Sequence, residues 1–477
     1  MSSANDARQG SWCPRIANRD KPVYLAIADA IAADVGAGTL LPGQRLPPQR
    51  QLAERLGIDF TTVSRAYLEA RRRGLVDARV GQGTFVRAPA SAAPAPAERS
   101  APTAPAVPRV VDMTMNQPPL PDAPALLERL RAGIAAAAAD LGMADVLHYP
   151  GAGDGMEDRA AGAAWLAPRL PGVAAGRLLV TPGTQGALLA LLTALARPGD
   201  TVCVEALTYP GFKAVAAQLG LRIAGVPMDA DGIDPDALRA ALARHRPKAL
   251  YLIPTLHNPT TATMPPERRR AVVAAAREHG VPIIEDDIYG PLPADPPPPL
   301  AALAPDIVFH VAGLAKCVSP MLRIAYLVAP DARQALRVAA AQRATTLMAS
   351  PLTAAVARRW IADGTAAAVL GAVRAEAAAR RALAEAILPA DAVVTKPEAF
   401  HLWLRLREPW SRGEFAAHLR TRGIATVASD AFATTPEAPD ALRICLGAMA
   451  GRDETRRVLE TIADTLDQLP AAGGVII

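Results

Sequence analysis

Seven short apolar runs alternate with helical stretches between residues 177 and 328, and this alternation constrains the fold more than any other feature of the chain. Apolar runs separated by segments of helical length are typical of strands joined by crossover helices, which cover both faces of a sheet. The runs occupy residues 177–180, 201–204, 221–226, 249–253, 281–284, 307–311 and 324–328. We therefore predict an α/β fold with a mainly parallel, seven-stranded sheet.

Further domains are expected because 477 residues are too many for one hydrophobic core. The segment after about residue 330 is mainly helical, with one strand at 401–406, which predicts a smaller α+β subdomain. Alanine and proline dominate residues 88–110 and indicate a linker. We expect a flexible tail at 1–20, a small domain at 21–87, this linker, and a main domain at 111–477. Its large subdomain is expected at about 141–330, and its small subdomain at about 111–140 plus 331–470.

The apolar content does not predict a membrane protein. The longest apolar helix, at about 186–196, is too short to span a bilayer, and the N-terminus lacks the apolar core of a signal peptide. The four cysteines lie far apart and fit no metal or disulfide spacing, which favours a reducing compartment and no metal site. The sequence therefore predicts a cytoplasmic protein without a membrane partner.

The net positive charge of the chain comes entirely from its first fifth. Residues 1–87 contain 13 Lys and Arg against 8 Asp and Glu, whereas the remainder contains 38 of each. Such asymmetry in one small domain indicates a nucleic-acid partner for that domain. The balanced remainder favours a small-molecule role.

Three helices and a hairpin are predicted in this basic region, at 22–35, 49–56, 60–73, 75–78 and 83–86. This order is typical of a winged helix-turn-helix that binds double-stranded DNA. The outward face of the third helix would consist of Thr62, Arg65, Glu69 and Arg72. The alternative treats the basic residues of this helix as a solvated surface. The residues expected to contact DNA are Arg50, Thr61, Thr62, Arg65, Gly81 and Gly83.

Chemically informative residues follow the predicted strands, where ligands bind in parallel sheets. Lys316 follows the strand at 307–311 and precedes Arg323 by seven residues. A lysine whose pKa is lowered in a cation-rich site can form an imine, although a lysine at a strand end is often only a solvated cap. The run 181–185 opens a helix, so its backbone N–H groups and the Thr184 hydroxyl could hold a phosphate. Tyr209, after another strand, could stack on a ring or be an ordinary turn aromatic.

Two further strand ends complete the pattern. Asn258 can donate to a phenolate oxygen, and Tyr289 could share that oxygen. The acidic run 285–287 offers a carboxylate for a protonated pyridine nitrogen, while Lys316 and Arg323 offer an amine and a phosphate-binding guanidinium.

With these motifs, residues 111–469 resemble the fold-type I, class I/II aminotransferases, which use pyridoxal 5'-phosphate, and residues 21–87 resemble the GntR-type winged helix. The combination resembles the MocR/GabR family of bacterial transcription regulators. The resemblance implies that Lys316 bonds the cofactor as an imine and Asp286 pairs with its ring nitrogen. The remaining implied roles are Asn258 and Tyr289 at the ring oxygen, Gly183, Thr184, Gln185 and Arg323 at the phosphate, Tyr209 stacked on the ring, Tyr149 at the phosphate of a partner subunit, and Arg443 at the carboxylate of an amino acid.

The resemblance also implies a head-to-tail homodimer that reads paired half-sites. Gly313 departs from the family pattern, which has serine there, and Phe60 stands where arginine is frequent. Three functions stay open on the sequence. The first is a DNA-binding regulator that senses pyridoxal phosphate, an amino compound, or both. The second is an active aminotransferase with an accessory DNA-binding domain, and the third is a repressor whose second domain is catalytically silent.

Overall fold

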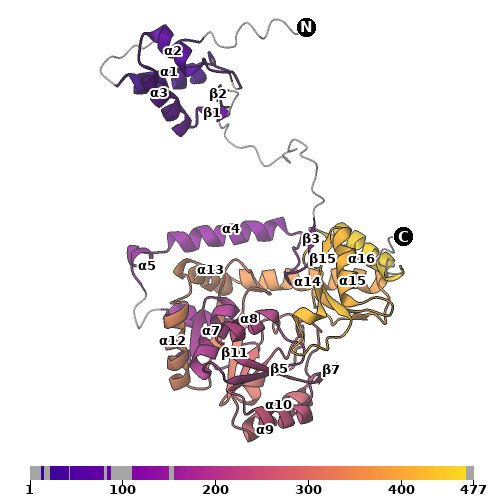
Figure 1. Ribbon diagram of the computed structural model, residues 1–477. Helices are drawn as coiled ribbons and strands as arrows, with labels where there is room; N and C mark the ends of the chain where they lie inside the picture. Colours follow the sequence, from indigo (N-terminus) through magenta and orange to yellow (C-terminus); the bar gives the residue numbers. More distant parts are fainter. Residues whose placement is uncertain are drawn as a thin grey trace. The chain divides into compact units, whose positions relative to one another are not determined.

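The computed structural model describes residues 12–14, 22–41, 43–79, 83–87, 110–149 and 155–468. The chain divides into two compact units, Met1–Pro105 and Ala106–Ile477 (Figure 1). The expected linker lies outside the described residues except for Val110. Among the helices that the structure describes, none is both long enough and apolar enough to cross a membrane.

The first unit is the predicted winged helix-turn-helix. Gly57, in the left-handed conformation at φ 63°, ends the second helix, and Asp59 caps the third by accepting a hydrogen bond from the Thr61 backbone N–H at 2.7 Å. Apolar residues at helical spacing meet in one core, from Ile27 in the first helix to Val63 in the third. The elements are α1 (Val23–Gly36), α2 (Gln49–Leu56), α3 (Phe60–Arg72), β1 (Val76–Arg79) and β2 (Gly83–Val86).

Trp12, which lies within the tail expected at 1–20, packs in the core of the first unit. Its indole is buried in the core of the first unit and donates a hydrogen bond to Asp34 at 2.7 Å. An isolated tryptophan outside any periodic segment gives no pattern that predicts where it packs. Apart from residues 12–14, the tail lies outside the described residues.

The second unit contains the predicted sheet. Within its described residues the strands are in the order β4-β12-β11-β10-β9-β5-β6. All are parallel except β12, which runs antiparallel to both neighbours, so the prediction of a mainly parallel sheet is confirmed. The bounds are β4 (Leu178–Thr181), β5 (Thr201–Glu205), β6 (Arg222–Val226), β9 (Ala249–Leu252), β10 (Ile283–Asp286), β11 (Val308–Gly313) and β12 (Ala325–Val328).

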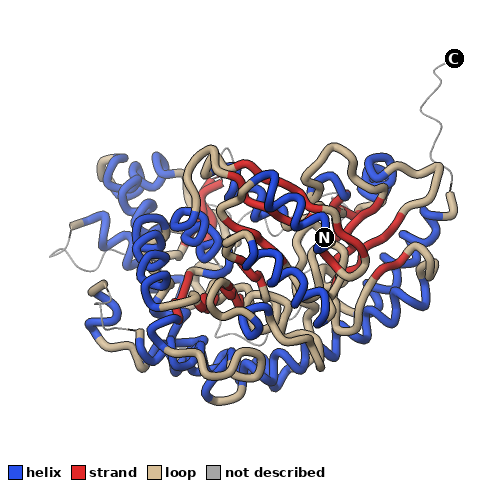
Figure 2. The backbone as a smooth tube through the Cα atoms, turned by 90° about the horizontal axis from the view of Figure 1, so that it is seen from below, coloured by secondary structure: helices blue, strands red, loops and turns tan. Residues whose placement is uncertain are grey.

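Helices cover both faces of this sheet (Figure 2). Successive strand residues point to opposite faces, so Ile283 joins one core and Ile284 the other. One face packs against α6 (Met156–Leu166), α9 (Pro235–His245), α10 (Pro266–Glu278), α11 (Leu300–Leu303) and α13 (Pro351–Ala362). The other packs against α7 (Gly183–Leu195), α8 (Pro210–Gln218) and α12 (Ala332–Thr345). Shorter elements on this unit are η2 (Ala175–Arg177), α5 (Met143–Leu147), β7 (Met228–Asp229) and β8 (Gly232–Ile233).

Three helices expected in the small subdomain pack with the large sheet instead. Val338 of α12 and Trp360 of α13 lie in the two sheet cores, and Ala137 of α4 (Pro124–Ala139) lies beside α13 (Figure 1). The structure packs these helices with the large sheet, and the subdomain boundaries expected at about 140 and 331 stay predictions. Helical periodicity identifies an apolar face but not the surface that it covers.

The small subdomain has its own core around a sheet that is antiparallel throughout its described residues, in the order β13-β14-β17-β16. The long helix α14 (Thr365–Ile387) joins the two subdomains, because Val373 packs in the large-sheet core and Ala384 in the small one. The remaining elements are β3 (Val111–Asp112), β13 (Val393–Val394), β14 (His401–Arg405), α15 (Arg412–Thr421), β15 (Ile424–Ala425), β16 (Val427–Ala428), η3 (Ser429–Ala431), β17 (Ala441–Cys445) and α16 (Arg452–Leu466).

Candidate functional site

Most of the predicted cofactor-site residues lie at one edge of the large sheet. The carboxyl ends of its parallel strands share this edge, and the reversed direction of β12 brings its amino end there too. Gly313 of β11 pairs with Ala325 of β12, which pairs in turn with Thr181 of β4. The loops that carry Lys316, Arg323 and Gly183 are therefore neighbours.

Lys316 lies in the loop after β11 and is partly buried. Its Nζ donates a hydrogen bond to the backbone carbonyl of Asn116. Burial, helped by the positive charges of Arg443 and Arg323, lowers the pKa of the Lys316 ammonium to about 8, against the opposing effects of Cys445 and Asp286. A lysine in this state supplies a nucleophilic amine near neutral pH.

Asp286 is the carboxylate of the acidic run that faces Lys316. It is buried and accepts hydrogen bonds from the Tyr251 hydroxyl at 2.9 Å and the Ile288 backbone N–H at 3.3 Å. Burial raises the pKa of Asp286 to about 7. Sequence reasoning missed Tyr251, whose ring stacks on Phe212 with centroids 3.9 Å apart. The strand register that places Tyr251 opposite Ile284, two residues before Asp286, cannot be read from residue types.

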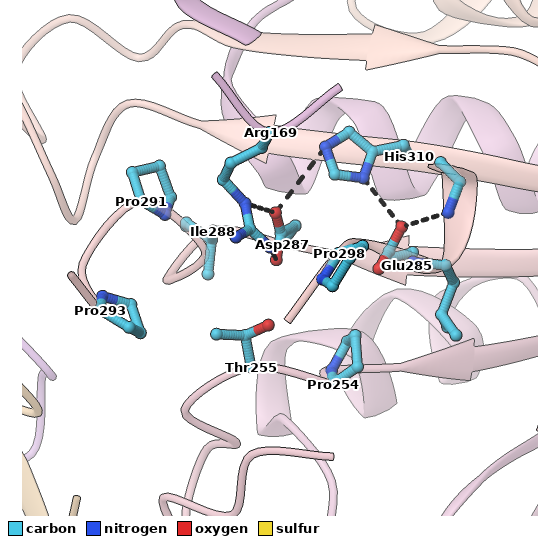
Figure 3. Close-up of polar contacts among 12 residues, drawn as sticks. Arg169, Pro254, Thr255, Glu285, Asp287, Ile288, Pro291, Pro293, Pro298 and His310 are labelled. Carbon is cyan, nitrogen blue, oxygen red and sulfur yellow. Dashed lines mark hydrogen bonds and ion pairs between the residues drawn. The ribbon is translucent and has the colours of Figure 1, made fainter. Parts of the chain in front are cut away.

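The other two acidic residues of the run belong to a separate buried network (Figure 3). Arg169 makes two hydrogen bonds with the Asp287 carboxylate, at 2.8 and 3.1 Å. Glu285 pairs with His310 Nδ1 at 2.9 Å and lies 3.8 Å from Arg269. Burial alone would lower the pKa of His310, but the hydrogen bond and charge of Glu285 outweigh it and raise that pKa. Asp287 and Glu285 are thus paired with Arg169 and His310, whereas Asp286 accepts only from a neutral hydroxyl and a backbone N–H.

Tyr289 lies in a polar group that includes a residue we did not predict. Asn116 Nδ2 donates to the Tyr289 hydroxyl at 2.9 Å and lies 3.2 Å from His401 Nδ1. Burial lowers the pKa of His401 to about 3, so its ring is neutral, and Nε2 donates to the His257 carbonyl at 3.1 Å. A single asparagine in the segment before α4 gave no motif by which to find Asn116.

Arg443 and Asn258 are brought together on the same side of Lys316. Arg443 Nη1 donates to the Asn258 side-chain oxygen at 3.0 Å, and Nη2 donates to the Thr114 backbone carbonyl at 2.6 Å. The guanidinium lies 5.1 Å from the ring centre of Phe432. The buried Nε of Arg443 has no acceptor among the described residues, so the side chain can accept a further ligand.

The start of α7 presents hydrogen-bond donors that suit an anion. Gly183 has φ 75°, and a Cβ atom there would lie 3.2 Å from the guanidinium of Arg323. The Thr184 hydroxyl and Gln185 Oε1 are buried without partners, and Arg323 has no acceptor among the described residues. The free N–H groups at the helix start, an unpaired hydroxyl and a guanidinium fit a phosphate group.

Gly313 sits against this anion site. A Cβ atom at residue 313 would lie 2.4 Å from the Thr184 hydroxyl oxygen and 3.2 Å from Ile288. The Thr184 hydroxyl therefore occupies the space in which the expected family serine would lie. This contact gives a physical reason for glycine at that position.

The two predicted tyrosines Tyr209 and Tyr149 differ in burial. The Tyr209 ring folds over the start of α8, against Gly211, and burial raises its pKa, as does the charge of Asp286. Tyr149 is 76% exposed and has no partner among the described residues. Tyr209 thus belongs to the site of its own chain, whereas the structure does not bring Tyr149 into it.

Three of the predicted DNA contacts, Thr61, Thr62 and Arg65, lie on α3. Arg65 lies over the Tyr24 ring at 4.4 Å, and Glu69 pairs with Arg73, which pairs with Asp29 of α1. Thr62 is half-buried, and the contact of Arg65 with Tyr24 places part of the expected DNA face against α1. Gly83 begins β2 against Arg45, and Gly81 lies outside the described residues.

Other residues of α2 and α3 are exposed. Arg50 and Thr61 are exposed there, as expected, and Arg50 lies 5.9 Å from the ring centre of Phe60. Phe60 is 43% and Leu68 is 57% exposed, and neither was predicted as a contact. An adjacent pocket is lined by Gln49, Ser64, Tyr67, Leu68, Arg71, Val76 and Thr84.

Comparisons with known proteins agree with this architecture. Residues 108–462 match the family model of aminotransferase class I and II, and residues 23–86 match the gntR family of bacterial regulatory proteins. The HTH-type transcriptional regulator YdeF of Bacillus subtilis is 30% identical, over 96% of this chain and 97% of its own. The vitamin B6 salvage pathway transcriptional repressor PtsJ of Salmonella typhimurium is 29% identical, over 65% of this chain and 68% of its own. LysN, an alpha-aminoadipate aminotransferase of Thermus thermophilus solved with N-(5'-phosphopyridoxyl)-L-leucine, shares the fold with a TM-score of 0.67 at 24% identity, over 75% of this chain and 92% of that one.

Proposed function

Since this chain belongs to the aminotransferase class I and II family and, over nearly its whole length, to the HTH-type regulators with a gntR-family domain, we propose that a small amino compound bound in its second unit controls DNA binding by its first. The chain is a transcription regulator that depends on pyridoxal 5'-phosphate. The observation that carries the proposal is the set of groups around Lys316, which is complete enough to bind both a cofactor and an amino acid.

The residues of this site fit the cofactor group by group. Pyridoxal phosphate, when bound, supplies an aldehyde that reacts with amines and a ring nitrogen that draws electrons from the reacting carbon. Lys316 provides the amine, and its lowered pKa keeps part of it unprotonated near neutral pH. Asp286 holds a proton at the ring nitrogen, with the Tyr251 hydroxyl fixing the carboxylate. The Thr184 hydroxyl and the Arg323 guanidinium supply donors without acceptors among the described residues, and the backbone N–H of Gln185 at the start of α7 adds a third donor for the phosphate.

Arg443 defines the class of effector. Its guanidinium is buried, keeps one N–H without an acceptor, and lies in the same group as Lys316 and Asn258. A buried guanidinium of this kind prefers a carboxylate, which it binds through two parallel hydrogen bonds. We therefore assign the effector to compounds that carry both an amine and a carboxylate.

We further propose a head-to-tail homodimer that reads paired half-sites in double-stranded DNA, in the cytoplasm where that DNA lies. The exposed Tyr149 supports a dimer, because a residue that reaches the phosphate site of a partner subunit must be free on its own subunit. Two winged helices in one dimer match two half-sites.

DNA retardation tests the regulatory function. Full-length protein should retard DNA from upstream of its own coding sequence, and the affinity should change when pyridoxal phosphate is added. Failure to retard that DNA, with or without pyridoxal phosphate, would remove the basis for a regulator.

An active aminotransferase is the second candidate. The lowered pKa of Lys316 favours it, because a lysine amine released at this site can also remove a proton from the substrate carbon. Multiple turnovers of keto acid from a panel of amino donors would support this function. Binding of amino acids without turnover would favour sensing alone.

A further inference from the structure

The segment Thr114–Asn116 contacts three of the groups that would bind ligands. The Thr114 carbonyl accepts from Arg443 Nη2 at 2.6 Å, and the Asn116 carbonyl accepts from Lys316 Nζ. The Asn116 side chain also donates to the Tyr289 hydroxyl at 2.9 Å. No role is assigned to this segment by the sequence motifs or by the proposed function.

These contacts compete with an amino acid. A carboxylate bound to Arg443 through two hydrogen bonds uses Nε, which is unpaired, together with a terminal nitrogen. Nη2 is already engaged by the neutral Thr114 carbonyl, a weaker acceptor than a carboxylate. A carboxylate that takes Nη2 as its second donor shares that nitrogen with the Thr114 carbonyl and weakens one of the contacts that hold the segment in place.

The side chain of Asn116 is buried with one polar atom unsatisfied. It is 4% exposed, yet its Oδ1 atom has no donor among the described residues. A buried acceptor without a partner costs free energy, so the segment gains a hydrogen bond when Asn116 turns to another donor or to water.

The same segment follows directly from the connection to the first unit. Only Met113 separates it from β3, which pairs in parallel with β15 of the small subdomain. The backbone N–H of Met113 donates to the Ala425 carbonyl at 2.8 Å, and that of Val111 donates to the Gly423 carbonyl at 2.8 Å. A shift of Thr114–Asn116 thus acts on the strand that anchors the end of the linker.

We infer that Asn116 is a positioning residue of the effector site, and that a bound amino acid carboxylate displaces Thr114–Asn116 and so alters the anchor of the linker at β3. This inference rests on the proposed function, because it assumes a cofactor at Lys316 and a carboxylate at Arg443. It assigns the route from the effector site to the chain segment that leads to the DNA-binding unit.

Two matched probes test it on the full-length protein without cofactor. Phosphopyridoxyl-L-alanine carries the cofactor and a carboxylate in one molecule, whereas phosphopyridoxyl-ethylamine lacks only the carboxylate. Hydrogen exchange of the peptide covering residues 111–120 should be faster with the first probe than with the second, by about tenfold for the loss of one hydrogen bond to a charged group. Equal exchange with both probes bound, or slower exchange with the carboxylate, overturns the inference. If neither probe binds, the cofactor assignment fails as well, which separates the two failures.

Variants in the same segment supply the control. Asn116→Ala should speed exchange without any ligand and shrink the difference between the probes. In the protein loaded with pyridoxal phosphate, the absorption of the bound cofactor would be followed as the pH is raised. Asn116→Ala should move the midpoint of that absorption change to higher pH, because Tyr289 loses the hydrogen bond that lowers its pKa. Gln117→Ala removes an exposed side chain of the same chemistry and should change neither measurement. Equal spectra and exchange in both variants would overturn a role for Asn116.

Discussion

Asp286 should make the cofactor-free protein less stable as pH rises. The carboxyl group is buried, and its pKa is raised from 3.8 to about 7. Because the folded state holds the proton more tightly than the unfolded chain does, stability falls as pH rises from about 4 through 7 and stays low above it. Three pKa units correspond to about 4 kcal/mol at 1.36 kcal/mol per unit.

Asp286→Asn removes this titration and keeps nearly the same shape. The new side chain still offers an oxygen to the Tyr251 hydroxyl and carries no charge to bury. The free energy of unfolding of Asp286→Asn should therefore match that of the wild type near pH 4. It should exceed the wild-type value by as much as about 4 kcal/mol above pH 8. The variant gains stability at the expense of the group that holds the ring nitrogen.

Urea titrations of both proteins across this pH range, followed by tryptophan fluorescence, measure the difference. Comparison at each pH cancels the other titrating groups. Pyridoxal phosphate should narrow the gap, because a protonated ring nitrogen is the partner that the buried carboxylate lacks. A variant that is no more stable than the wild type at high pH, or a gap that does not change with pH, would refute the reasoning.

Three other substitutions test separate parts of the molecule. Arg169→Leu should lower the free energy of unfolding by about 3–5 kcal/mol in urea titrations, because it strands the buried Asp287 carboxylate, and the double variant Arg169→Leu/Asp287→Leu should recover most of the loss. No recovery would contradict this cause. Trp12→Ala should lower the free energy of unfolding of the first unit by about 3–5 kcal/mol, which a lower thermal midpoint would report. An unchanged midpoint would exclude Trp12 from the core. The exposed Phe60 should contact a thymine methyl group in the operator. Replacing operator thymines by uracil one at a time should therefore weaken DNA binding about fourfold at one position, because burial of one methyl group contributes about 0.8 kcal/mol. Phe60→Ala should be insensitive to that exchange, and a wild type that never distinguishes the two bases would contradict the contact.

The elements of the fold were largely readable from the sequence. The predicted strand at 201–204 became β5, Thr201–Glu205, and the predicted helix at 49–56 is α2 without change. Strand direction was not readable, because residue types carry no signal for the polarity of a neighbour. The antiparallel β12 is what brings Arg323 to the edge that holds Lys316.

The candidate site was readable only where side chains follow strand ends. Lys316 and Asp286 lie where the pattern placed them, although their roles stay predictions. Asn116 and Tyr251 could not be found, since each reaches the site through tertiary packing rather than through a local motif. The same limit explains α3, where a face that is polar in sequence turns out to be partly covered by α1.

The central claim is that the state of Lys316 controls DNA binding, and fluorescence anisotropy of the full-length protein on its upstream DNA tests it most directly. Wild type and Lys316→Ala would be titrated with and without pyridoxal phosphate. The account predicts that the cofactor shifts the dissociation constant of the wild type and leaves that of Lys316→Ala unchanged. Identical DNA affinity in all four titrations would contradict it.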